Sequence, residues 1–143
     1  MGFLTRRVGA SLAQNLTRIV LGAFMTAAGT LHLTVARDDF RAQVPSWVPV
    51  DADLVVLGSG VVEVTLGVAL LTLPRYRRLT GVALAAFYVV IFPGNIAQYV
   101  DGVSAFGLDT DTKRLVRLFF QPVLVAAALY AAGLPERRRS PSE

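Results

Sequence analysis

The sequence predicts an all-α integral membrane protein, an antiparallel four-helix bundle that crosses the bilayer four times. First, the chain of 143 residues is 54% hydrophobic and only 17% charged, which is more apolar surface than one small water-soluble core hides. Second, its apolar residues form four blocks of about twenty residues, the length that spans a hydrocarbon layer. Third, the connections between the blocks are short, so successive spans run antiparallel.

The predicted spans form a single domain, residues 1–135, and a polar cytoplasmic tail at 136–143 is expected to be disordered. The spans cover roughly residues 15–35, 54–73, 80–100 and 115–132. The first two contain several glycines and alanines, small residues that let helix backbones approach closely in lipid. A compact bundle is therefore expected.

The connection between the first two spans holds the segment Val44-Pro45-Ser46-Trp47-Val48-Pro49. Tryptophan is enriched at membrane–water interfaces, so the whole connection, residues 36–53, is interpreted as an interfacial elbow. An ordinary surface loop remains the alternative.

Spans three and four contain Pro93 and Pro122. Each proline removes a backbone donor and frees a carbonyl one turn earlier, so each kink is expected to face protein or a cavity.

The basic residues predict the orientation of the chain in the membrane. Nine of the fourteen fall on one predicted side, namely Arg6, Arg7, Arg18, Arg75, Arg77, Arg78, Arg137, Arg138 and Arg139. By the positive-inside rule that side is cytoplasmic, which predicts a multi-pass protein of the cell membrane with both termini in the cytoplasm. The net charge is +4, but the basic residues are distributed as an orientation signal. No nucleic-acid partner is therefore expected.

Polar side chains recur in every span, at depths and helical phases that bring them together. The predicted ligand-binding cluster comprises His32, Glu63, Asn95, Arg117 and Gln121, and Tyr88, Gln98 and Arg114 are candidates for its wall. A carboxylate at mid-membrane is costly unless it is protonated or paired. Arg117 is the expected partner of Glu63, because a guanidinium pairs with a carboxylate in a bidentate way, and His32 offers a second donor.

Two readings of this cluster stay open. It can consist of interhelical hydrogen bonds that fix the register of the helices, or it can bind the polar head of a quinone, sterol or other lipophile whose tail stays in the bilayer. One histidine and no cysteine fall short of a transition-metal site, so no metal is expected. No nucleophile stands at a recognisable spacing from a base, and catalysis by this chain alone is not predicted.

Five motifs in order resemble those of the DoxX-like membrane proteins, over roughly residues 16–132. They are Gly29-Thr30-Leu31-His32, Val44-Pro45-Ser46-Trp47-Val48-Pro49, Ser59-Gly60-Val61-Val62-Glu63-Val64-Thr65-Leu66-Gly67, Phe92-Pro93-Gly94-Asn95 and Arg117-Leu118-Phe119-Phe120-Gln121. The family motif positions are His32, Glu63, Asn95 and Gln121. Two positions depart from the family pattern. Leu33 stands where an aromatic residue often follows the histidine, and Gly94 stands where an alanine often precedes the asparagine.

The resemblance implies a four-helix bundle related to the small membrane subunit of thiosulfate:quinone oxidoreductase and to membrane partners of detoxifying redox enzymes in actinobacteria. We therefore expect an accessory subunit that binds a quinone or a similar lipophile and supports a membrane-associated oxidoreductase. Its partners would be the lipid bilayer, a redox enzyme or another membrane subunit, or a second copy of the chain. A non-catalytic scaffold or assembly factor is the alternative, and a small transporter is the third.

Overall fold

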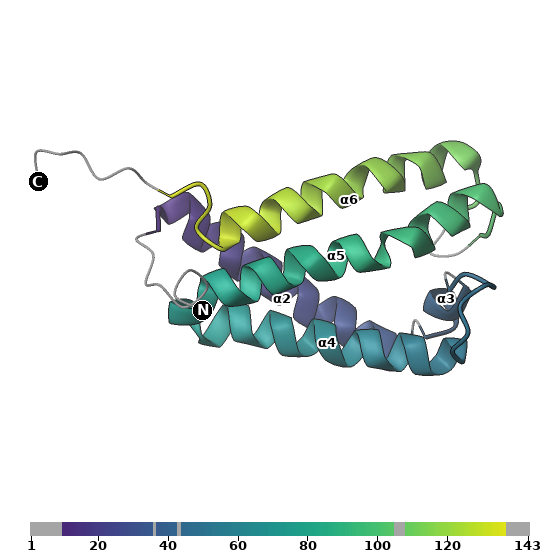
Figure 1. Ribbon diagram of the computed structural model, residues 1–143, viewed down its shortest axis with the longest axis horizontal. Coiled ribbons are helices and arrows are strands. Elements are labelled where there is room, and N and C mark those ends of the chain that lie inside the picture. The colour runs from purple at the N-terminus through teal and green to yellow at the C-terminus, as the bar shows by residue number, and fades with distance from the viewer. Residues whose placement is uncertain (1–9, 36, 43, 105–107, 137–143) are drawn as a thin grey trace, which may run out of the picture.

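The computed structural model describes residues 10–35, 37–42, 44–104 and 108–136, and within these ranges every regular element is a helix (Figure 1). The long helices are α2 (Leu12–Leu33), α4 (Ala52–Thr72), α5 (Arg77–Val100) and α6 (Asp111–Ala131). Two short elements, α3 (Arg37–Ala42) and the 3-10 turn η1 (Pro74–Tyr76), lie in the connections. The predicted all-α four-helix bundle is confirmed.

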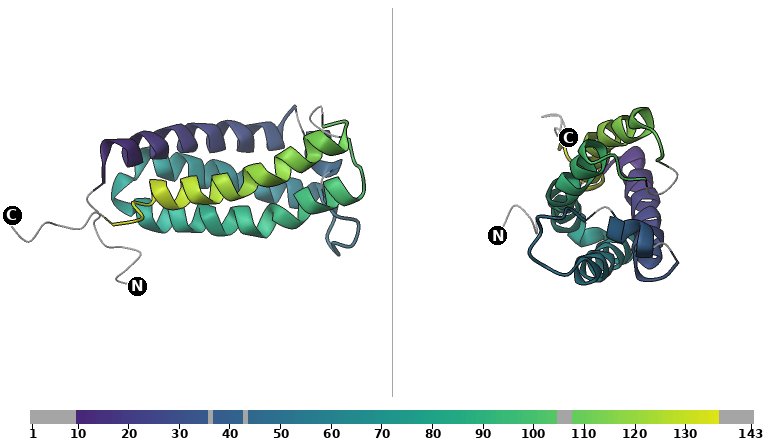
Figure 2. Two further views of the ribbon diagram at one scale, coloured as in Figure 1. Left: turned by 90° about the horizontal axis from the view of Figure 1, so that it is seen from above. Right: turned by 90° about the vertical axis from the view of Figure 1, so that its right-hand side faces the viewer.

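Each of the four long helices is long and apolar enough to cross a membrane. They lie side by side with their axes roughly aligned (Figures 1 and 2), and large apolar side chains such as Val20, Val90 and Phe119 are exposed on their outer surfaces. Because water would disfavour these surfaces, they are suited to lipid. The chain is therefore a multi-pass membrane protein.

All four long helices begin earlier than their apolar blocks predicted, and polar N-caps extend three of them, α2, α4 and α6. Ser11 and Gln14 form a reciprocal capping box at the start of α2, in which each side chain accepts from the other residue's backbone N–H, at 3.1 and 2.9 Å. Thr110 accepts from the backbone N–H of Lys113 at the start of α6. Such caps satisfy helix N–H groups that have no partner within the helix.

The helices associate mainly as two pairs, with α2 packed along α4 and α5 packed along α6. A Cβ atom on Gly67 of α4 would lie 2.6 Å from the backbone nitrogen of Thr26 on α2, closer than atoms approach. Only glycine allows these two backbones to come so near, as expected for helices that associate in lipid.

The two ends of the bundle differ in character. At the end where α2 begins and α6 ends, buried apolar side chains fill the interior, among them Leu21, Leu70, Leu84 and Ala128. The same end carries the buried residues Arg18, Arg77 and Arg78, and we call it the arginine end. The opposite end carries α3 (Figure 1), and we call it the α3 end.

At the arginine end, two arginines cap the C-termini of neighbouring helices. Arg18 of α2 donates to the carbonyls of Leu70 and Leu71 in the last turn of α4. Arg77 of α5 donates from Nε to the carbonyl of Ala131 in α6 at 2.9 Å, and from Nη2 to the carbonyl of Gln14 at 3.1 Å. The last carbonyls of a helix lack partners and carry partial negative charge, so guanidinium groups suit them.

At the α3 end, the predicted interfacial elbow contains the short helix α3. Arg37 donates from Nε to Asp53 at the start of α4 over 2.7 Å and forms an ion pair with the same carboxylate. This hydrogen bond raises the pKa of Arg37. Arg41 approaches Asp53 at 3.9 Å. These contacts hold α3 beside the start of α4, so the elbow covers the end of the bundle.

One sequence prediction concerns residues that lie mostly outside the described ranges, and the predictions for the two prolines have different outcomes. The expected disorder of the tail concerns residues that lie almost wholly outside the described ranges. Pro93 lies within α5 and lines the cavity described below, which is the environment expected for it. Pro122, by contrast, is exposed on the outer surface of α6. Its neighbour Gln121 is the residue that faces the interior.

Candidate functional site

A cavity of about 600 Å³ opens within the bundle on its α3 side, between the two helix pairs. Most of its lining is apolar and includes Phe24, Phe87, Ile91 and Leu124 from the long helices and Phe40 and Trp47 from the α3 segment. Its polar lining consists of His32, Ser59, Glu63, Tyr88, Asn95 and Arg117. A mostly apolar cavity with a few convergent polar groups is typical of small-molecule sites.

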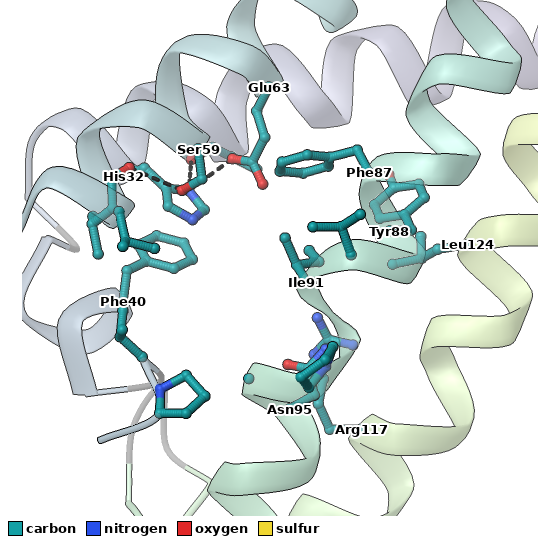
Figure 3. Close-up of a pocket in the computed structure, with 18 of the residues that line it drawn as sticks. His32, Phe40, Ser59, Glu63, Phe87, Tyr88, Ile91, Asn95, Arg117 and Leu124 are labelled. Carbon is teal, nitrogen blue, oxygen red and sulfur yellow. Dashed lines mark hydrogen bonds and ion pairs between the residues drawn. The ribbon is translucent and has the colours of Figure 1, made fainter. Parts of the chain in front are cut away.

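His32 and Glu63 form a close pair on the α2–α4 side of this cavity, and their side chains are almost fully buried. Nδ1 of His32 lies 2.8 Å from Oε2 of Glu63 and 2.9 Å from the backbone carbonyl of Ala28. A carbonyl can only accept, so Nδ1 carries the hydrogen and shares it between two acceptors. The other carboxylate oxygen of Glu63 points into the cavity (Figure 3).

The close packing of α2 on α4 creates this pair. A Cβ atom on Gly60 would lie 2.9 Å from Cβ of His32, so the missing side chain lets His32 lie against α4 within reach of Glu63. On its other side, the imidazole ring stacks on Phe40 of α3, with 3.1 Å between ring centroids and an interplanar angle of 17°. His32 is thus held between a neighbouring helix and the elbow.

A second polar group lies on the α5–α6 side and is organised by Gln121. Its Oε1 accepts from Nη1 of Arg117 at 3.1 Å and from Nδ2 of Asn95 at 3.3 Å. Its Nε2 donates to the backbone carbonyl of Tyr88 at 2.7 Å. Gln121 is only 2% exposed and stands behind the cavity lining, so it orients Arg117 and Asn95 rather than reaching into the cavity.

The expected ion pair between Glu63 and Arg117 is wrong. Glu63 lies against His32, whereas Arg117 donates to Gln121 one turn further along its own helix. The physical reason is the pairing of the helices, because α4 packs on α2 and not on α6. The two groups line the same cavity from opposite sides, with the guanidinium of Arg117 and the carboxylate of Glu63 both turned toward its interior (Figure 3).

The three candidate wall residues have different positions. Tyr88 lines the cavity, and its hydroxyl donates to Sδ of Met25 at 2.7 Å. Gln98 and Arg114 are buried but lie outside the lining. Arg114 instead donates to the carbonyl of Leu108 at 3.0 Å and approaches Asp111 at 3.4 Å, so it holds the connection that leads into α6.

The sequence interpretation did not identify Ser59 or Phe40 as residues of the cavity. Ser59 stands one helical turn before Glu63, and this spacing was a signal that both share a face of α4. Its hydroxyl donates to the carbonyl of Val56 at 2.9 Å, so its oxygen can still accept from a ligand. Phe40 is the apolar residue among four charged neighbours in the elbow, and the structure uses its ring against His32.

Comparisons with known proteins identify the family of the chain but give no activity. A comparison with curated proteins and a comparison with solved structures found no match. A family model described as a domain of unknown function (DUF8561) matches residues 21–132. This range covers well over half of the chain and contains every polar residue of the cavity lining. The chain therefore belongs to the DUF8561 family, whose domain is described as one of unknown function.

Proposed function

We propose that the protein binds a quinone or a similar flat lipophile in this cavity and acts as a DoxX-like accessory subunit of a membrane-associated oxidoreductase. One observation carries the proposal. Glu63 and Arg117 bear opposite charges and face the same cavity, yet each contacts a different neighbour, His32 and Gln121 respectively. A ligand between them completes the hydrogen bonding of both.

The energetics of the membrane interior favour this interpretation. A charged side chain at the centre of a spanning helix costs about 2.5–3.5 kcal/mol on insertion scales. A purely structural pair would bring Glu63 and Arg117 into contact and offset that cost, whereas the fold holds them apart across a cavity of about 600 Å³. That volume lies within the usual range for small-molecule sites. Phe40 and Phe87 supply flat apolar surfaces for a ring.

The proposed partner supplies the chemistry that this chain lacks. The chain has no cysteine, so thiol or persulfide chemistry would belong to a redox enzyme bound at the membrane surface. The clustering of basic residues at the arginine end supports an orientation in which that end is cytoplasmic. The cavity then lies toward the outer leaflet of the cell membrane, and its lipophilic ligand would arrive from the bilayer.

A scaffold is the second candidate, and the network around Gln121 favours it. Gln121 joins α6 to the side chain of Asn95 and to the backbone of Tyr88 in α5, which is what a register-fixing contact does. This function predicts that cavity substitutions affect folding and that partner binding depends on exposed surface. A scaffold function gives no role to the carboxylate of Glu63, which faces an open cavity.

Native mass spectrometry of the chain, gently extracted from its own membrane, tests the proposal when it is combined with organic extraction of the same sample. We expect a stoichiometric quinone or similar lipophile in the wild type and in the control variant Thr65→Val, whose hydroxyl lies on an exposed face of α4. We expect the lipophile to be absent from Glu63→Leu. A ligand-free wild type would favour the scaffold.

A further inference from the structure

The two sides of the cavity differ in their hydrogen-bonding character. On the α2–α4 side, Nδ1 of His32 carries its hydrogen toward Ala28 and Glu63, so in the neutral ring Nε2 has a lone pair and accepts. The cavity-facing oxygen of Glu63 (Figure 3) is a carboxylate acceptor as well. This side therefore presents acceptors to a ligand.

The opposite side presents donors. A guanidinium has five N–H groups and no acceptor, and only Nη1 of Arg117 is bonded within the described contacts, to Gln121. The guanidinium lies at the cavity (Figure 3), so its remaining N–H groups can serve a ligand there. Because Gln121 also holds Asn95 and is itself bonded to the backbone of Tyr88, the position of the guanidinium is restrained.

The lining between these two sides is apolar, with Phe87, Ile91 and Leu124 among its residues. A ring that spans the cavity must donate a hydrogen bond at one end and accept one at the other. A quinone carries a carbonyl acceptor at each end, so one of its carbonyls would face the carboxylate of Glu63 without a hydrogen between them. A hydroquinone places a hydroxyl there, which donates to Glu63, and its second oxygen accepts from Arg117.

We infer that the cavity discriminates between the redox states of its ligand, binding the hydroxyl-bearing, reduced form of a ring lipophile more tightly than the dicarbonyl, oxidised form. This inference rests on the proposed function and deepens it. A hydrogen bond to a charged group contributes enough for a preference of about tenfold or more. Preferential binding of the reduced form raises the midpoint potential of the bound two-electron couple by about 30 mV per tenfold.

The experiment compares the affinities of 2,3-dimethyl-1,4-naphthoquinone and its hydroquinone for the full chain in phosphatidylcholine nanodiscs under anaerobic conditions. Empty nanodiscs give the contribution of lipid partitioning, which is subtracted. We expect the hydroquinone to bind at least about tenfold more tightly. In Glu63→Gln the ratio should fall toward one, because an amide can donate to a quinone carbonyl as well as accept. Thr65→Val should keep the wild-type ratio.

The outcomes separate the inference from the proposed function. Equal affinities, or tighter binding of the quinone, in the wild-type chain would overturn the inference and leave lipophile binding intact. No binding of either form above the empty-nanodisc level would overturn both. The wild-type ratio needs no variant, so the inference remains testable if Glu63→Gln fails to fold.

Discussion

At the scale of single residues, Glu63 occupies a position that stability alone does not explain. Its Oε2 is buried without a fully formed hydrogen bond, although Nδ1 of His32 lies 2.8 Å away, because the hydrogen on that nitrogen is also directed at Ala28. A buried acceptor that is only partly satisfied destabilises the fold. A destabilising side chain in the lining of a cavity is the expected signature of a functional residue.

This geometry predicts the behaviour of Glu63→Leu. The substitution leaves no orphaned donor, because Nδ1 of His32 keeps the carbonyl of Ala28 at 2.9 Å. We expect the folded yield of Glu63→Leu to equal that of the wild type or exceed it, while ligand binding is lost. Fluorescence-detected size exclusion measures the yield. A collapse of the folded fraction would show that Glu63 holds the bundle together.

Gln121 should behave in the opposite way. Gln121→Leu leaves Nη1 of Arg117 and Nδ2 of Asn95 without their acceptor, and it removes the side-chain donor to the carbonyl of Tyr88. Each buried group left unsatisfied costs about 1–3 kcal/mol. We therefore expect a lower thermal unfolding midpoint as well as lost binding. An unfolding midpoint equal to that of Thr65→Val would contradict this role.

The sequence predicted which residues gather but not how they pair. Depth and helical phase placed His32, Glu63, Asn95 and Arg117 at one level, and all four line the cavity. The partner of Glu63 was mistaken because that choice depends on whether α2 or α6 packs against α4, a tertiary fact set by close contacts at Gly60 and Gly67. The same limit applies to Gln121, whose position behind the lining cannot be derived from spacing.

At the scale of the elements, the arginines of the predicted cytoplasmic side also have a structural role. Arg18 caps the C-terminus of α4 and Arg77 caps that of α6. Each therefore joins two helices at one end of the bundle. The sequence interpretation treated both arginines only as orientation signals. The sequence does not show which helix has its C-terminus beside a given arginine.

A substitution that keeps the charge separates these two roles. In Arg77→Lys the positive charge remains, so orientation should not change. An ammonium on a flexible stem cannot reproduce donors that reach Ala131, Asn15 and Gln14 together. We expect a lower unfolding midpoint with unchanged topology. If Arg77→Lys unfolds like the wild type, the caps contribute little to stability.

At the scale of the whole molecule, the apolar core and the arginine caps fill one end and the cavity lies toward the other. The end with the caps is cross-linked by hydrogen bonds between all four long helices. The α3 end is joined through the elbow, in which Arg37 and Arg41 contact Asp53. We therefore expect any motion that admits a ligand to occur near the α3 end.

The proposed orientation is tested by single cysteines, since the chain contains none. We expect Ser46→Cys, in the elbow, to react with a membrane-impermeant maleimide added outside intact cells. Ser140→Cys, near the C-terminus, should react only after the cells are opened. The positive-inside rule supplies the reason for this difference. Labelling of both positions from the same side would contradict the four-span topology.

The measurement that tests the central claim most directly is photoaffinity labelling with an azide-bearing naphthoquinone in native membranes, followed by peptide mapping. Our account predicts that the label falls on the cavity lining, in the peptides that hold Phe40 or Phe87 to Ile91, and that Glu63→Leu and Arg117→Gln each remove it. Labelling spread over lipid-facing residues such as Val116 and Phe119, and equal in all three chains, would contradict it.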